Sequence, residues 1–584
     1  MAAERKRVEK FEIETLRHST AHVLAAAITR LYPGALPTIG PPIENGFYYD
    51  FDMPPVKPED FPKIEAEMKK IIAEDLPFVR EEASRKQLLE TFKGNKYKVE
   101  LIKENVPEGG SSTIYRLGDY VEFCLGPHAS SSGAIKAFKL VQTASSYWRG
   151  DEKRESLIRI YGTAWPTQKE LDYYLKMREE AEKRDHRNLN RLHHYYLLSP
   201  EVGPGLVIWL PAGAAIRAEL EKFEREEQLK RGYQMVYTPH IGNKQLWITS
   251  GHWDLYRDKM YAPMEIDKDQ YLVKPMSCPM HMQVYKSQTR SYRDLPVRIA
   301  EIATVYRYEQ AGELSGLARV RYITQDDSHL FCRPNQVRDE IIGLIDLVET
   351  IYNRMGLKDI ECWLSVRDPK NKDKYLGSDE VWDSAEKTIA EAAAAKGYKT
   401  IRAEGEGKFY GPALDIMVRD ALGRKWQCAT MQVDFMLPER FQLEYIGEDN
   451  KPHRPVILHC TPMGSLERFV SVLIEHFGGR FPVWLSPVQV RVLTLTDRSL
   501  QFAQSIAKQL IDAGVRVDTD FSPATLDYKV RGAQLAQIPY MLVIGDKEVA
   551  AGTLAVRTRD NKVKFGVKPE AFMAEIRDLI ERRV

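Results

Sequence analysis

The sequence of 584 residues is poor in cysteine, carries almost no net charge and has no long apolar run. Its six cysteines are scattered, with no close Cys-x-x-Cys pair, which excludes a disulfide framework and fits a reducing compartment. No apolar stretch approaches the length of a membrane span, and the first residues lack the apolar core of a signal peptide. The 84 basic and 83 acidic residues leave no global field to attract a polyanion, although local basic patches can. We therefore predict a soluble cytoplasmic protein with no membrane partner.

The chain is too long for a single hydrophobic core, and its patterns divide it into four parts. The first part mixes helix and strand patterns, and the second is a charge-rich stretch that predicts one exposed connecting helix. A large central part follows. The last part alternates strands and helices, which is typical of a mainly parallel sheet. We place these parts at residues 8–166, 167–191, 192–482 and 483–584.

The stretch from Arg298 to Cys332 organises the central part. Its alternating pattern, which we trace from Leu317 to Phe331, predicts two antiparallel strands joined by a polar loop around Gly312. Arginine side chains there suit phosphate oxygens, which they bind with two parallel hydrogen bonds. Asp326 or Asp327 is a candidate partner for a substrate ammonium group. The alternative is a solvated hairpin with ordinary surface ion pairs.

A second group of polar residues lies in the N-terminal part. His18 and His22 are four residues apart in a helical pattern, so both rings lie on one helix face. Cys124 and His128 flank a Gly-Pro pair that predicts a loop. These residue types fit a metal site or a hydrolytic pocket in which imidazoles position water. From spacing alone, a purely structural role, with two half-buried histidines and a core cysteine, is favoured over a metal site, and a metal site over a hydrolytic pocket.

These motifs resemble those of the threonyl-tRNA synthetases. Arg307-Tyr308-Glu309 is similar to the second signature of class II aminoacyl-tRNA synthetases, and GSLERF at 464–469 is similar to the third. A helix that starts near Ser465 would place Arg468 in its first turn. The run TQDDSHLFC at 324–332 and the motifs HSTAH and CLGPH resemble that family specifically. The resemblance implies a class II catalytic core built on an antiparallel sheet, an N-terminal α+β editing domain and a C-terminal α/β anticodon-binding domain. The family's usual extreme N-terminal domain is expected to be missing, because HSTAH begins almost at once.

The resemblance also implies the ligands of the central part. One catalytic Zn²⁺ per chain is expected on Cys278, His329 and His459, with His281 outside the first shell. Arg307 and Arg468 are the expected catalytic residues, and ATP, with Mg²⁺, is expected to contact Arg307, Glu309, Arg319 and Arg468. Ile323 stands where the family usually has a phenylalanine that stacks on adenine, and Tyr322 is the neighbouring ring that can compensate. L-threonine is expected to contact Met276, Gln325, Asp327, Tyr410, Gln427, Thr430 and Gln432, of which Gln427 faces the wrong way unless a bulge intervenes.

In this family the N-terminal domain hydrolyses seryl-tRNA that is made in error. The resemblance places that editing pocket at His18, His22, Cys124, His128, Lys98 and Tyr49. A site that binds a hydroxyl rejects valine strongly, but the missing methyl of serine is worth only ~1–3 kcal/mol, so a second site is needed. The expected partners are tRNA(Thr), which Glu548 and Arg557 would contact at the anticodon, and a second copy that would pair through residues 212–239.

Two rival functions remain at this point. A synthetase-derived protein could bind RNA or regulate without charging it, as the missing domain and Ile323 would allow. A related class II enzyme could charge proline or serine instead. Zinc content distinguishes an enzyme that charges proline or serine from one that charges threonine. Adenylate formation distinguishes a charging enzyme from a protein that only binds RNA.

Overall fold

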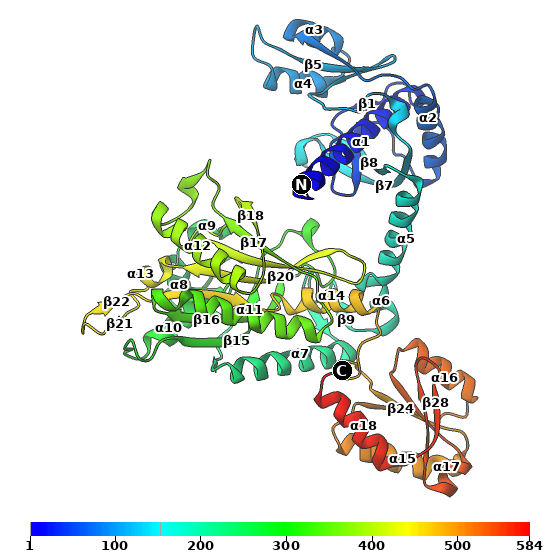
Figure 1. Cartoon of the computed structure of the whole chain (residues 1–584), viewed down its shortest axis with the longest axis vertical. Coiled ribbons are helices and arrows are strands. Elements are labelled where there is room, and N and C mark those ends of the chain that lie inside the picture. Colours follow the sequence, from blue (N-terminus) through cyan, green and yellow to red (C-terminus); the bar gives the residue numbers. More distant parts are fainter. Residues whose placement is uncertain (1, 152) are drawn as a thin grey trace. The chain divides into compact units, whose positions relative to one another are not determined.

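The computed structural model describes residues 2–151 and 153–584, which form two compact units divided between Glu179 and Glu180 (Figure 1). The division falls within α5 (Gln168–Arg184). Our prediction of one helix over 167–191 is wrong, because the helix is interrupted at Asp185. The Asp185 side chain accepts a hydrogen bond from the Arg187 amide and so caps the start of a second helix, α6 (His186–His193). Among the described residues no helix is long and apolar enough to cross a membrane.

The N-terminal unit packs the long helix α1 against a sheet in the order β1-β3-β8-β7, with β2 paired to β3. Apolar residues of α1 such as Leu24 and Ile28 are fully buried with Phe47 and Ile160 of the sheet. A second sheet, β4-β5-β6, carries α3 and α4, and the loop that leaves β6 holds Cys124 and His128. The bounds are α1 (Ala2–Leu31), β1 (Leu36–Pro37), β2 (Pro42–Ile43), β3 (Gly46–Asp52), α2 (Phe61–Ala73), β4 (Val79–Ser84), α3 (Arg85–Thr91), α4 (Lys96–Asn105), β5 (Ser111–Leu117), β6 (Tyr120–Phe123), β7 (Ala137–Tyr147) and β8 (Ser156–Trp165).

The second unit is built on an eight-stranded sheet in the order β11-β15-β16-β23-β20-β19-β17-β18 (Figure 1). Only the pairs β11–β15 and β17–β18 are parallel, which confirms the expected antiparallel core. The predicted hairpin is confirmed as β15 and β16, although β16 starts at Tyr322 and residues 317–321 belong to a turn. The strand bounds are β11 (Gln234–Met235), β15 (Val297–Tyr306), β16 (Tyr322–Cys332), β17 (Ile360–Val366), β18 (Thr400–Glu404), β19 (Ala413–Arg419), β20 (Lys425–Asp434) and β23 (Val456–Thr461).

Helices α11 and α14 pack on one face of this sheet, while the other face carries α10 and a cavity. Apolar residues of α11 and α14, such as Leu344 and Phe469, form one core with Leu330, Val433 and Leu458 of the strands. Each fully buried side chain of this kind contributes about 1.5–3 kcal/mol. Helix α14 begins where Ser465 accepts a hydrogen bond from the Arg468 amide, so Arg468 lies in the first turn as predicted. The helix bounds are α7 (Pro211–Lys230), α8 (Gln245–Thr249), α9 (His252–Leu255), α10 (Cys278–Lys286), α11 (Val337–Arg354), α12 (Asp379–Ala395), α13 (Met436–Arg440) and α14 (Leu466–Phe477).

The C-terminal segment forms a five-stranded sheet in the order β25-β24-β26-β27-β28, drawn in orange and red in Figure 1. The prediction of a mainly parallel sheet is wrong, since only β24 pairs in parallel, with β25 and β26. A parallel return needs a connection of a dozen or more residues, whereas α17 is short and a tight turn joins β27 to β28. The bounds are β24 (Val490–Thr494), α15 (Leu500–Asp512), β25 (Val517–Asp520), α16 (Leu526–Leu535), β26 (Tyr540–Ile544), α17 (Asp546–Ala551), β27 (Leu554–Thr558), β28 (Val563–Val567) and α18 (Pro569–Glu581).

A buried carboxyl on α7 is expected to make the stability of the second unit depend on pH. Glu224 is fully buried, accepts a hydrogen bond from Gln228, and has a second oxygen without a hydrogen-bond partner among the described residues. Burial raises the pKa of Glu224 to about 8, although Arg231 opposes this. The folded state therefore binds this proton more tightly than the unfolded state, and stability falls as pH rises from about 4.5 towards 8.

The variant Glu224→Gln removes this titration and keeps an acceptor for Gln228. Between pH 6 and 9 the midpoint of thermal unfolding should fall by roughly 2–4 °C more in the wild type than in the variant. The matched control is Glu221→Gln on the same helix, whose carboxylate pairs with Arg217 at 2.7 Å. Parallel pH profiles for wild type and Glu224→Gln would show that Glu224 does not titrate in this range.

Candidate functional site

A cavity of about 470 Å³ opens in the second unit, on the face of the large sheet opposite α11 and α14. It is lined by every residue that the resemblance assigned to zinc, ATP or threonine, whereas Asp326, the alternative ammonium partner, does not line it. The assigned residues are Met276, Cys278, Arg307, Glu309, Arg319, Gln325, Asp327, His329, Tyr410, Gln427, Thr430, Gln432, His459 and Arg468.

Strand register brings the distant residues together. His329 of β16 is directly opposite His459 of β23, which in turn is opposite Gln432 of β20. Because side chains alternate along a strand, Asp327 shares the cavity face with His329, while Asp326 faces the helices. Asp326 accepts hydrogen bonds from the amides of Met463 and Gly464. Our earlier alternative of Asp326 as an ammonium partner is therefore wrong, and Asp327 is the remaining candidate.

Cys278, His329 and His459 form a donor cluster at one end of the cavity. One ligand atom from each lies within 4.8 Å of the others. His459 Nε2 is 2.8 Å from Asp434 Oδ2, which fixes the proton on Nε2 and leaves a lone pair on Nδ1. A thiol and two such imidazoles are the donor types that zinc prefers, and three protein ligands leave one position open.

The second imidazole of this cluster is fixed in a similar way. His329 Nδ1 lies 2.8 Å from His281 Nδ1, and His281 Nε2 lies 3.2 Å from Glu301 Oε2. Glu301 accepts a hydrogen bond from His281 Nε2, so the neutral His281 ring has its lone pair on Nδ1. His281 Nδ1 therefore accepts a hydrogen bond from His329 Nδ1, which leaves the lone pair of His329 on Nε2. His281 thus stands behind His329 with both nitrogens engaged, outside the donor cluster as predicted.

Three arginine side chains also line the cavity. Arg307, Arg319 and Arg468 line it together with Glu309, which accepts from Lys259 at 2.8 Å and from Arg319 at 3.3 Å. Arg307 Nε is buried and has no hydrogen-bond partner among the described residues, as a group that awaits a ligand would be. Arg468 Nε donates to the carbonyl oxygen of Ala318 at 3.2 Å. Three guanidinium groups on one wall can bind a polyphosphate.

The bulge that Gln427 requires is present in β20. The register with β19 shifts between Ile416 and Met417, so Cys428 is left unpaired in the ladder. The shift turns Gln427 towards the cavity, where its Nε2 donates to Asp415 at 2.8 Å. Sequence pattern left both orientations open, and the structure selects the bulged one.

Two features of the cavity differ from the sequence analysis or were missed by it. Ile323 lines the cavity but Tyr322 does not, so Tyr322 cannot supply a ring above a ligand there. His252 of α9 lines the cavity, with Nδ1 held 2.7 Å from Ser250 Oγ, and burial lowers the pKa of His252 to about 3. A lone histidine in a helix of four residues gives no periodic signal, so only residue-by-residue similarity to relatives would reveal it.

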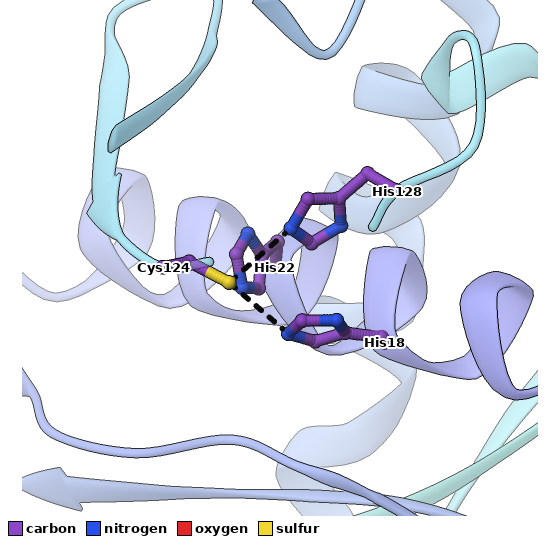
Figure 2. A group of neighbouring side chains, drawn as sticks. All are labelled: His18, His22, Cys124 and His128. Atoms are coloured by element: carbon purple, nitrogen blue, oxygen red, sulfur yellow. Dashed lines mark hydrogen bonds between the residues drawn. The ribbon is translucent and has the colours of Figure 1, made fainter. Parts of the chain in front are cut away.

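The N-terminal unit holds a second group of side chains. Figure 2 shows that the rings of His18, His22 and His128 and the sulfur of Cys124 point towards one another. Cys124 Sγ lies 3.4 Å from His18 Nε2 and 3.5 Å from His128 Nε2. Helix α1 supplies two of the rings and the loop after β6 supplies the other two residues, as the sequence predicted.

The electrostatics of this group keep its members neutral. Burial lowers the pKa of His128 to about 3 and that of His22 well below its ordinary value. Burial also raises the pKa of the Cys124 thiol to about 11. A neutral imidazole has a lone pair that accepts a hydrogen bond from water, so the group is suited to holding and orienting a water molecule.

Lys98 and Tyr49 lie in a buried network beside this group. The Lys98 ammonium and the Tyr49 and Tyr120 hydroxyls all hydrogen-bond to the Glu122 carboxylate. The charge of Lys98 is one of the influences that lower the pKa of His22, after burial and the two other imidazoles. The network is therefore near enough to act electrostatically on the cluster, although neither Lys98 nor Tyr49 hydrogen-bonds to it among the described contacts.

The two residues expected at the anticodon lie on separate elements of the C-terminal sheet. Glu548 belongs to α17 and accepts from the Gly545 amide at 3.0 Å, so it caps its own helix. Arg557 belongs to β27 and donates to Asn561 at 3.4 Å. Both are partly exposed and could reach a ligand after small side-chain movements.

Comparisons with known proteins match three segments of the chain to described families. Residues 261–477 match the tRNA synthetase class II core domain (G, H, P, S and T), and residues 489–579 match an anticodon binding domain. Residues 112–161 match the threonyl and alanyl tRNA synthetase second additional domain. The three segments cover the residues of the central cavity, the loop with Cys124 and His128, and the C-terminal sheet, whereas His18 and His22 lie outside them.

Whole relatives give the same result. The threonine–tRNA ligase of Gloeobacter violaceus is 48% identical over 98% of this chain and 93% of its own length. The threonine–tRNA ligase of Thermus thermophilus is 47% identical over 98% of this chain and 90% of its own. A solved structure, described as the RNA binding domain of threonyl-tRNA synthetase from Cryptosporidium parvum, is 37% identical with a TM-score of 0.64, and covers 68% of this chain and 98% of that one.

Proposed function

The chain belongs to the threonine–tRNA ligase family, and we propose that it activates L-threonine with ATP and transfers the threonyl group to tRNA(Thr). The observation that carries this proposal is one cavity lined by both a Cys/His/His donor cluster and three arginines. The donor cluster suits a small amino acid with a polar side chain, and the arginines suit a triphosphate.

The three arginines that line the cavity account for the activation step. The threonine carboxylate attacks the α-phosphate of ATP and displaces pyrophosphate. Arg307 and Arg468, together with the Mg²⁺ that accompanies ATP, stabilise the charge that develops on the transferring phosphate. Glu309 and Arg319 hold the nucleotide, and the 3′-terminal ribose of the tRNA then attacks the adenylate. Positioning and charge stabilisation supply most of the rate, so the reaction needs no dedicated side-chain base.

The donor cluster accounts for the choice of amino acid. Cys278, His329 and His459 would hold one Zn²⁺ per chain, since both imidazoles present a lone pair and the thiol is among them. When bound, the zinc ion supplies a Lewis acid for an amine and a hydroxyl. Asp327 lines the same cavity and would accept a hydrogen bond from the substrate amine. Valine lacks the hydroxyl and is therefore rejected, whereas serine keeps it.

The N-terminal cluster removes the serine error. We assign His18, His22, Cys124 and His128, with Lys98 and Tyr49 beside them, to the hydrolysis of seryl-tRNA(Thr). Burial keeps His22 and His128 neutral by lowering their pKa values, so their lone pairs can hold and orient the water that attacks the ester.

Further parts of the proposal concern partners and location. Tyr237 and Leu229 are 77% and 52% exposed, which supports homodimer formation through residues 212–239. Glu548 and Arg557 are assigned to anticodon bases. The domain limits remain 8–166, 167–191, 192–482 and 483–584, and six free cysteines fit a cytoplasmic enzyme.

The purified protein is expected to catalyse threonine-dependent exchange of pyrophosphate into ATP and to contain about one zinc per chain. One zinc per chain would mean that only one of the two Cys/His clusters is occupied, because occupancy of both would give two. A protein that shifts tRNA in a gel but forms no adenylate would be a regulator rather than a ligase. Well under one zinc, with activation of proline or serine in place of threonine, would move the chain to a related specificity.

A further inference from the structure

His186 and Glu475 form a buried pair that the proposed reaction does not use. Both are only 3% exposed, and they come from the start of α6 and the last turn of α14. The His186 amide donates to Glu475 Oε1 at 3.0 Å, and the His186 ring Nδ1 lies 2.6 Å from the same oxygen. Arg424 lies 2.6 Å from the other Glu475 oxygen. Such a buried, paired histidine needs a structural or functional reason.

The second ring nitrogen of His186 binds the backbone of a different segment. The Leu317 amide donates to His186 Nε2 at 3.1 Å. A backbone amide is always a donor, so Nε2 carries the lone pair and the ring proton sits on Nδ1, where it is donated to Glu475. Asp185, His186 and Glu475 lie close enough to hold a metal ion, but neither ring nitrogen is free to bind one.

The segment that His186 holds is the turn before β16. Arg319 and Ser315 exchange backbone hydrogen bonds of 3.1 and 3.2 Å across it. Gly316 has φ +50°, and a Cβ atom at this position would collide with the His186 ring. The turn and the imidazole are therefore in close contact, with the Leu317 side chain fully buried beside them.

Helix α14 holds the same turn at a second point. Arg468 Nε donates to the carbonyl oxygen of Ala318, the residue that follows Leu317. Arg468 and Glu475 are seven residues apart on α14, so they lie on one face two turns apart. A shift of the turn would thus displace Arg319, which belongs to it, and would release Arg468, which it anchors.

We propose that His186 is a positioning residue for nucleotide binding: it clamps the turn at 315–319 to α14 and so places Arg319 and Arg468 in the cavity. This inference rests on the proposed function, in which those arginines bind ATP. Among the described residues no hydrogen bond joins the clamp to Cys278, His329 or His459. The clamp should therefore govern ATP and leave threonine and zinc binding unchanged.

Two substitutions separate the halves of the clamp. In His186→Asn the amide nitrogen can replace Nδ1 as the donor to Glu475, but nothing reaches the Leu317 amide. In His186→Gln the longer side chain can place its oxygen near the former Nε2 and accept from Leu317. In pyrophosphate exchange we expect KM for ATP to rise about tenfold in His186→Asn and to recover to within about threefold in His186→Gln. KM for threonine and the zinc content should stay at the wild-type values.

Hydrogen exchange provides a second readout that a general loss of stability would not reproduce. The amide of Leu317 should exchange faster in His186→Asn, while peptides from α14 keep their protection. His193→Ala, at the other end of α6, is the control for damage to the helix and should change neither readout.

The outcomes separate the clamp from the proposed function. A wild-type protein without threonine-dependent exchange would overturn the proposed function itself. An active wild type with an unchanged KM for ATP in His186→Asn would overturn the clamp alone. Equal increases of both KM values, or loss of zinc, would mean that His186 only supports the fold, and would also contradict the proposal.

Discussion

Replacement of Cys278 by serine is expected to remove the bound zinc and to lower kcat/KM for threonine activation by about a thousandfold or more. The thiol is the only sulfur donor in its cluster, and a serine hydroxyl does not become an anionic ligand near neutral pH. The loss corresponds to ~4 kcal/mol of interaction with the amine and hydroxyl of threonine. Metal analysis by mass spectrometry and pyrophosphate exchange on the same preparation measure both effects.

The matched control for this substitution is Cys124→Ser. Cys124 also lies within hydrogen-bonding distance of two imidazoles, but in the N-terminal unit. This variant should keep about one zinc per chain and activate threonine at the wild-type rate. Zinc retained in Cys278→Ser and lost in Cys124→Ser would place the metal in the wrong unit for the proposed function.

Seryl-tRNA(Thr) is expected to accumulate when the N-terminal cluster is damaged. His18→Ala or Cys124→Ala should slow hydrolysis of supplied seryl-tRNA(Thr) by about a hundredfold or more, the usual contribution of a positioned acid or base. Threonine charging should stay within about twofold, because the synthetic cavity lies in the other compact unit. Deacylation of isolated seryl-tRNA and charging with labelled threonine are the two assays.

The two cysteine variants should each lose one activity and keep the other. Cys278→Ser should still hydrolyse supplied seryl-tRNA, and Cys124→Ala should still charge threonine. If His18→Ala or Cys124→Ala lowers both activities equally, those residues support the fold and do not edit.

Local sequence patterns predicted the elements that carry the synthetic cavity. The hairpin of β15 and β16, the start of α14 at Ser465 and the position of Arg468 in its first turn are confirmed, because each depends on short-range periodicity and capping. The family resemblance and the class II fold are confirmed by the comparisons. Which residues bind metal and substrates remains a prediction, although the cavity is lined by all the residues that the resemblance assigned to zinc, ATP and threonine.

Other features depend on tertiary contacts and could not be predicted in this way. The break at Asp185 leaves a charged sequence helical on both sides, and the burial of His186 follows only from Glu475 and Leu317, which are distant in the chain. The sheet at the C-terminus was predicted as mainly parallel because strands and helices alternate in sequence, whereas the length of each connection decides the direction of the next strand. Pattern also could not choose between Asp326 and Asp327, which the pleat of β16 separates.

The central claim is that the cluster of Cys278, His329 and His459 selects the amino acid through its side-chain hydroxyl. The most direct test is an activation profile of threonine, serine and valine on a preparation with measured zinc. The account predicts activation of threonine, weaker but measurable activation of serine, and rejection of valine by well over a hundredfold, in proportion to zinc content. Valine activated nearly as well as serine, or a profile that does not change when the zinc is removed, would contradict it.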